Sequence, residues 1–123
     1  MTEPSFTEKV HQASVALNLP GFPTETEENE QGLKHIAKHL GYSNFCDESA
    51  YAVVLFGFFK LSYKQERAKE LAVFSARMVS NVDYSDTALL NTDQLVGGTP
   101  EEFLATGMMA GRLIGALKTP QPF

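Results

Sequence analysis

The chain has 123 residues, of which 43% are apolar and 20% are charged. This length is typical of one domain, and the composition excludes collagen-like, coiled-coil-only and wholly disordered classes. The single cysteine, Cys46, excludes an internal disulfide framework and any zinc or redox motif that needs two cysteines. We expect one domain over residues 1–123, with flexible tails at 1–4 and 118–123.

The net charge of −5 is spread unevenly along the chain. Residues 1–31 carry a net −5, residues 32–82 a net +3, and residues 83–123 a net −3. Nucleic-acid binding needs a concentrated basic face, and the two acidic segments would be repelled by a polyanion. We therefore expect no nucleic-acid partner. The basic middle segment balances the chain's own acidic segments, or alternatively meets an acidic protein surface.

Targeting and membrane signals are also missing from the sequence. The N-terminal residues Met1–Ser5 include an acid where a signal peptide needs a base, and no apolar stretch follows them. The longest apolar run, residues 50–59, has half of the ~20 residues that a bilayer-spanning helix needs. We expect no membrane partner and a cytoplasmic location, which the unpaired cysteine also favours.

Two capping boxes predict the starts of the first two helices. Ser5 with Glu8, and Thr24 with Glu27, have the spacing at which a hydroxyl and a carboxylate satisfy amides of a first helical turn. Apolar residues recur at helical spacing after each box. The first helix is predicted to end near Asn18, before two prolines, and the second before Gly41, a residue suited to a left-handed terminator.

The apolar run at 50–59 is ambiguous, because its valines and aromatic residues also favour a strand. A lone strand would have no partner for its hydrogen bonds, and no second strand-like run is apparent. We therefore predict a helix, capped by Asp47 and buried in the middle of a bundle, since it is apolar on every side. A further amphipathic helix is predicted from about Ser62 or Gln65 to Val82.

Residues 83–98 are rich in turn-forming residues and are predicted to be a connection with one helical turn at most. Thr99 then provides a cap and Pro100 suits the first helical position, so the last helix is predicted to begin there. It should run to about Leu117, before the prolines of the tail. The resulting fold class is all-α, a single-domain bundle of four to five helices with the third and last helices central.

A metal site is one candidate for function. His35 and His39 stand four residues apart, which places both imidazoles on one helix face at a spacing that two metal ligands can use. Glu28 projects from the same row and is the third candidate ligand. The competing interpretation is a solvated polar face, because the two histidines point away from the apolar stripe. No cofactor is otherwise implied.

Cys46 is a second candidate, because a thiol at the start of a helix can become nucleophilic. The acidic neighbours Asp47 and Glu48 oppose thiolate formation, and Cys46 could equally be a small buried apolar residue. No nucleophile elbow or complete phosphate-binding loop is present. The paired acids Glu101 and Glu102 are explained by the dipole of the helix whose first turn they occupy.

The last helix gives the most informative pattern, because it is apolar around its whole circumference. Three glycines at four-residue spacing form a groove that another backbone can approach closely. Either the glycines face the 50–59 helix inside the molecule, or another molecule covers this side. The residues predicted to lie at such a contact are Met108, Met109, Arg112, Gly107, Gly111 and Gly115.

These patterns predict a non-enzymatic helical protein-interaction module: a regulator, adaptor or inhibitor of another protein, or a homodimer joined through the last helix. The alternative is a small metal-dependent or thiol enzyme that uses His35, His39 and Cys46. The absence of a catalytic triad or a dense ligand set from the sequence favours the first prediction.

Overall fold

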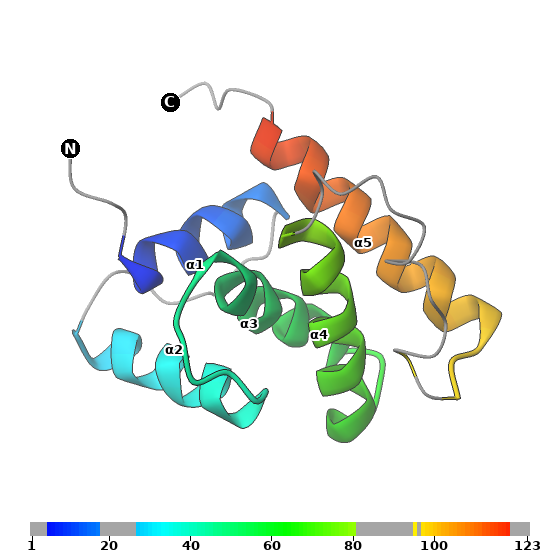
Figure 1. Ribbon diagram of the computed structural model, residues 1–123, viewed down its shortest axis with the longest axis horizontal. Coiled ribbons are helices and arrows are strands. Elements are labelled where there is room, and N and C mark those ends of the chain that lie inside the picture. Colours follow the sequence, from blue (N-terminus) through cyan, green and yellow to red (C-terminus); the bar gives the residue numbers. More distant parts are fainter. Residues whose placement is uncertain (1–4, 18–26, 81–94, 96, 119–123) are drawn as a thin grey trace.

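The computed structural model describes residues 5–17, 27–80, 95 and 97–118; the side chains of 27–29 and 118 are not described. Within these ranges the chain is an all-α single-domain bundle without strands, as the sequence predicts (Figure 1). The helices are α1 (Phe6–Ala16), α2 (Glu27–His39), α3 (Asp47–Phe59), α4 (Gln65–Ser80) and α5 (Pro100–Lys118).

Several predicted helix ends are confirmed by the local geometry. The Ser5 hydroxyl accepts a hydrogen bond from the amide of Glu8 at 3.2 Å, so half of the predicted box forms at the start of α1. After α2, Gly41 adopts a φ of 100°, the left-handed conformation that glycine tolerates best. The predicted cap Thr24, the Val82 end of the fourth helix and most of the 83–98 connection lie outside the described residues.

The segment that could have been a strand is α3, so the helix prediction is confirmed. The cap prediction is wrong by one residue: Cys46, not Asp47, is the N-cap, and its amide donates to the Ser49 hydroxyl at 2.7 Å. Helices α1, α2 and α4 all pack against α3, which explains why it can be apolar on every side. Helix α3 is therefore the centre of the bundle.

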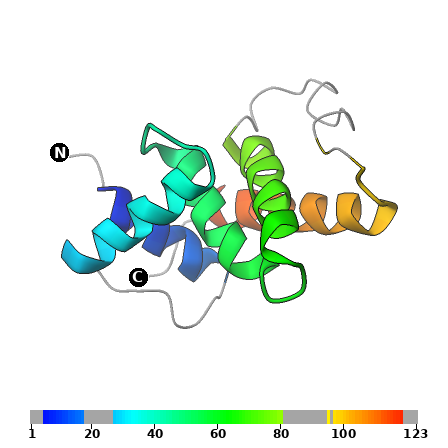
Figure 2. The same ribbon diagram turned by 90° about the horizontal axis from the view of Figure 1, so that it is seen from below.

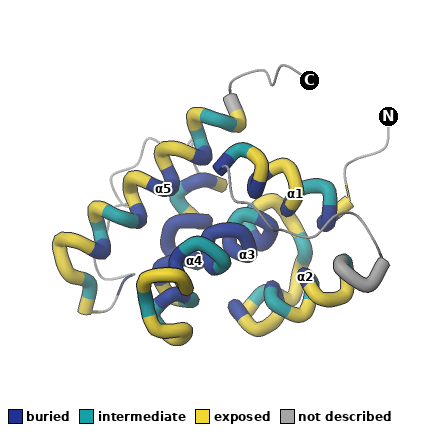
Figure 3. Tube along the Cα trace, turned by 180° about the vertical axis from the view of Figure 1, so that it is seen from behind, coloured by how far each residue is buried: buried dark blue, intermediate teal, exposed yellow. Residues whose placement is uncertain are grey.

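Helix α5 is not central, and that prediction is wrong. It packs along α4 and contacts α1 with one face only. Two perpendicular views place it at the edge of the molecule, opposite α2 (Figures 1 and 2). The other face of α5 points outward and is exposed (Figure 3). Among the described residues, no helix combines the length and apolarity needed to cross a bilayer.

Candidate functional site

A buried ion pair fixes α5 against α4. The Arg67 guanidinium donates through Nε to Glu102 Oε2 at 2.7 Å and through Nη2 to Oε1 at 2.9 Å. This two-point geometry holds both side chains in one orientation. Glu102 is 8% exposed and the Arg67 side chain is 22% exposed, so the pair is partly shielded from water. It therefore determines which side of the first turn of α5 faces the bundle.

The same carboxylate also caps α5. The Thr99 amide donates to Glu102 Oε1 at 2.9 Å, and the Glu102 amide donates to the Thr99 hydroxyl at 3.2 Å, which completes a capping box. The hydrogen bond from Arg67, followed by that from the Thr99 backbone, lowers the pKa of Glu102 to about 2. The sequence explained Glu102 by the helix dipole alone, and its partner Arg67 was missed.

Aromatic packing strengthens this attachment at the start of α5. The rings of Phe74 and Phe103 meet edge to face with centroids 5.9 Å apart. Gly98 lies under the same ring, because a Cβ at this position would come within 2.6 Å of a Phe103 ring carbon. Leu95, which is fully buried, closes the contact from the other side. These contacts at the first turn therefore orient α5 on α4.

Once α5 is oriented in this way, one of its faces is left without cover from the described chain. Leu104 is 64% exposed and Met108 is 57% exposed, although both are large apolar residues. The exposed positions recur every three or four residues, so they lie on one side of the helix. We call this side the outer face; its residues are Leu104, Gly107, Met108, Gly111, Arg112 and Gly115.

The three glycines of the outer face do not pack inside the molecule. Within the described part of the chain, a Cβ added at Gly107, Gly111 or Gly115 would have no heavy atom of another side chain or element within 4 Å. The alternative in which they face the 50–59 helix is therefore wrong, because α5 turns this side away from α3. Each glycine costs the helix about 0.8–1 kcal/mol relative to alanine, and no close contact in the described chain offsets that cost.

Met109 was predicted to share the open side with Met108, and this placement is wrong. It is only 5% exposed and belongs to the buried core, since a 100° step along the helix turns it inward. Leu104 was missed, although the spacing 104, 108, 111 and 115 could have identified it. Leu117 is 40% exposed but lies on the inner side, where the helix ends.

The predicted metal ligands are not brought into a cluster by the described residues. His35 and His39 are both exposed on α2, as predicted. The Nε2 atom of His39 lies 3.4 Å from the side-chain nitrogen of Gln65, and its ring packs near Phe56. Glu28 lies on α2, but its side chain is outside the described part of the molecule. Among the side chains that are described, no group of three potential ligands forms.

Cys46 is exposed, so its interpretation as a small buried apolar residue is wrong. Its side chain lies 3.9 Å from the Ser49 hydroxyl, which also bonds the Cys46 backbone. The ring of His39 packs beside Phe56. Phe56 follows Cys46 by ten residues, which corresponds to about 15 Å along the axis of α3. The side-chain hydrogen bonds found for His39 and Cys46 in the described part of the chain go to Gln65 and Ser49, not to each other.

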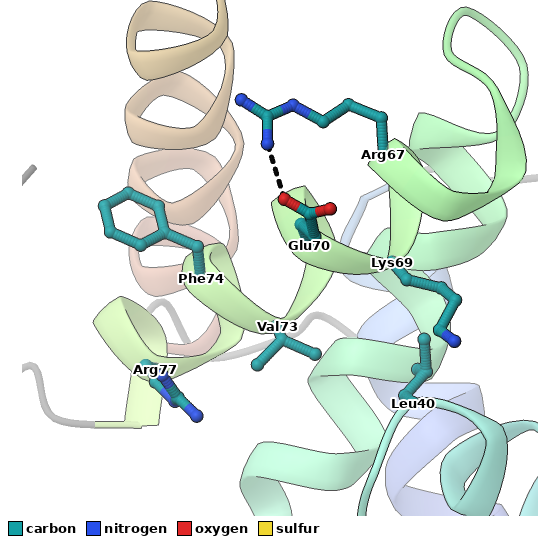
Figure 4. Close-up of a pocket in the computed structure, with 7 residues that line it drawn as sticks. All are labelled: Leu40, Arg67, Lys69, Glu70, Val73, Phe74 and Arg77. Carbon is teal, nitrogen blue, oxygen red and sulfur yellow. Dashed lines mark hydrogen bonds and ion pairs between the residues drawn. The ribbon is translucent and has the colours of Figure 1, made fainter. Parts of the chain in front are cut away.

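An open groove of about 570 Å³ runs along α4. Within it, Arg67 pairs with Glu70 as well as with Glu102, so its charge is already matched inside the molecule. Its ionisable lining residues are Arg67, Lys69, Glu70 and Arg77, and no histidine or cysteine is among the lining residues that the structure describes. The lining residues, drawn in Figure 4, are Leu40, Arg67, Lys69, Glu70, Val73, Phe74 and Arg77.

Models of known protein families, functionally characterised proteins and solved structures were all compared with this chain, and none matches.

Proposed function

We propose that the chain is a non-enzymatic helical protein-interaction module, a regulator, adaptor or inhibitor that binds another protein or a second copy of itself through the outer face of α5. The observation that carries the proposal is the exposure of Leu104 and Met108 side by side on a helix that is firmly attached by its opposite face. Clustered apolar side chains on a surface are typical of interaction sites. Methionine suits such a site, because its flexible side chain adapts to different partners.

The glycines of the outer face support the same proposal. They lie in the interior of a helix, and the described chain does not use their small size for a close contact. Gly107, Gly111 and Gly115 form a row beside the row of Leu104, Met108 and Arg112, and this row of small residues would let a partner helix approach closely. Arg112 is the one charged side chain in this stretch and would give the contact a polar edge.

The alternative, a metal-dependent or thiol enzyme using His35, His39 and Cys46, has less support. A thiol and an imidazole must lie within hydrogen-bond distance to act as a nucleophile and its base. Among the described residues, the Cys46 side chain lies near the Ser49 hydroxyl and His39 lies near the Gln65 amide, so neither partner provides that pair. The described side chains also assemble no three-ligand cluster.

The proposal is tested with the double variant Leu104→Lys/Met108→Lys. Because both side chains are exposed, the variant should fold with an unchanged melting temperature. It should lose the partners that the wild-type chain captures from a lysate of its own source cells. Leu61→Lys is the matched control, since Leu61 is 75% exposed on another surface. Partners captured equally well by all three proteins would contradict the proposal.

A further inference from the structure

We infer that the outer face of α5 binds the same face of a second copy of this chain, with the two helices antiparallel. This inference rests on the proposed function and specifies its partner. In the dimer, Leu104 of one copy lies against Gly115 of the partner, and Met108 lies against Gly111. Two-fold symmetry repeats both contacts, so that each copy supplies the large and the small residue of each pair.

The order of large and small residues on the outer face carries this inference. Along the helix the central positions are 104, 108, 111 and 115, with spacings of four, three and four residues. Reversing the helix reproduces the same spacings, so an antiparallel copy aligns all four positions at once. The large side chains occupy the first half, Leu104 and Met108, and the glycines occupy the second half, Gly111 and Gly115. Antiparallel pairing therefore places each large side chain over a glycine.

A parallel dimer fits the same face poorly. It would set Leu104 against Leu104 and Gly111 against Gly111, which crowds one end of the contact and leaves a gap at the other.

Charge at the helix ends supports the antiparallel register as well. The register sets position 101 of one copy beside position 118 of the other, and the sequence has a glutamate at the first and a lysine at the second. Antiparallel helix dipoles also attract, whereas parallel dipoles repel. A parallel pair would instead bring each acidic position 101 against its own copy. Complementary charge therefore favours the same partner and the same orientation as the order of side-chain sizes.

The size of the surface sets the expected strength. The 19 residues of α5 span about 28 Å at 1.5 Å per residue, which limits the contact to one helix pair. Such a contact is smaller than a standard interface of about 1,600 Å², and small interfaces are weak and transient. We expect a concentration-dependent dimer with a dissociation constant of roughly 10–100 μM.

Sedimentation equilibrium of the full chain tests self-association. The wild-type mass should rise from 13.5 kDa toward twice that value as the concentration passes through the expected range. Gly111→Leu should weaken the dimer at least about tenfold, because a leucine there meets Met108 of the partner. Gly32→Leu is the matched control: Gly32 is also an exposed helical glycine with no atom near a built Cβ, but it lies on α2.

Disulfide trapping tests the orientation, in a Cys46→Ser background that removes the exposed native thiol. A mixture of Leu104→Cys and Gly115→Cys chains should form a mixed disulfide dimer under mild oxidation. Leu104→Cys alone should not, because the two positions 104 lie about 16 Å apart along antiparallel helices, beyond the ~7 Å that a disulfide spans.

Three outcomes would overturn the inference. One is a mass that stays monomeric at every concentration, and another is equal weakening by Gly111→Leu and Gly32→Leu. The third is efficient cross-linking of Leu104→Cys with itself, which would require parallel helices. If the chain stays monomeric while the Leu104→Lys/Met108→Lys variant still loses a captured protein, only this inference fails. The proposed function fails as well if that variant loses nothing.

Discussion

Helices α3 and α5 have similar sequences in one respect, since both are apolar around most of their circumference, yet they have opposite environments. Helix α3 is enclosed by α1, α2 and α4. Among the described residues, helix α5 packs against α4 and α1, and it exposes Leu104 and Met108 on its outer face. A helix that is apolar on every side therefore needs cover, but its sequence does not say whether the same molecule supplies it.

Residue size distinguishes the two helices where polarity does not. The enclosed helix α3 directs large residues such as Leu55 and Phe59 into the core, and both are at most 1% exposed. In α5, Leu113 turns inward, whereas the large residues Leu104 and Met108 and all three glycines turn outward. In α5, the row of glycines therefore lies on the side of the helix that faces away from the core.

The largest expected effect comes from truncating one leucine in each helix. Leu55→Ala should lower the free energy of unfolding by about 3 kcal/mol, because the side chain is fully buried and its removal leaves a cavity. Leu104→Ala should change it by less than about 0.5 kcal/mol, because the side chain is mostly exposed. Urea denaturation at a protein concentration of a few micromolar measures both. Similar losses in the two variants would mean that the outer face is covered within the monomer.

A smaller effect is expected from the ion pair that sets the orientation of α5. Hydrogen bonds from Arg67 and from Thr99 lower the pKa of Glu102 from 4.5 to about 2, so they stabilise the fold when Glu102 is ionised. This contribution, about 2–3 kcal/mol, is complete above pH 5 and is lost as the pH falls toward 2. Glu102→Gln should therefore be less stable than wild type at pH 7 and nearly equal to it at pH 2.

The neighbouring acid provides the control for this pH dependence. Glu101 lies in the same first turn of α5 but is exposed. Glu101→Gln should therefore lower the free energy of unfolding by at most about 1 kcal/mol. Denaturant titrations of the three proteins between pH 2 and pH 7 compare them directly. A constant difference between wild type and Glu102→Gln across this range would show that the ionised pair does not hold α5 on α4.

The local part of the fold could be predicted from the sequence, because caps and terminators act within a few residues. Ser5, Gly41 and Pro100 mark helix boundaries at the positions that the structure shows. The Arg67 to Glu102 pair could not be predicted, since its members lie 35 residues apart and Glu102 already had a local explanation. Contacts between distant residues depend on how the helices pack, and no spacing rule gives them.

The candidate site was predicted in part for the same reason. The apolar sequence identified α5 and its glycines. However, a helix that has no polar face gives no signal in its sequence for which face is buried. Which face turns inward is decided by partners on α4, such as Arg67 and Phe74. The sequence therefore assigned Met109 to the wrong side, whereas the position of Met108 matches the prediction.

The smallest expected effect is also the sharpest test of the difference between α3 and α5. Gly111→Ala places a methyl group on the outer face, where no atom of the surrounding chain lies within 4 Å. Alanine favours a helix over glycine by about 0.8–1 kcal/mol, so the monomer should become more stable by up to that amount. Gly32→Ala on α2 is the control with the same chemistry and the same open surroundings.

The two alanine variants should differ only when a second copy is present. At low micromolar concentration both should raise the midpoint of urea denaturation. At several hundred micromolar the wild type gains stability from association, as any ligand of the folded state provides, and Gly111→Ala should gain less because its methyl group obstructs Met108 of the partner. The gain in stability of Gly111→Ala over wild type should therefore decrease as the protein concentration rises, whereas the gain of Gly32→Ala should stay the same. An advantage for Gly111→Ala that is the same at both concentrations would mean that this glycine is open in the monomer but not used in self-association.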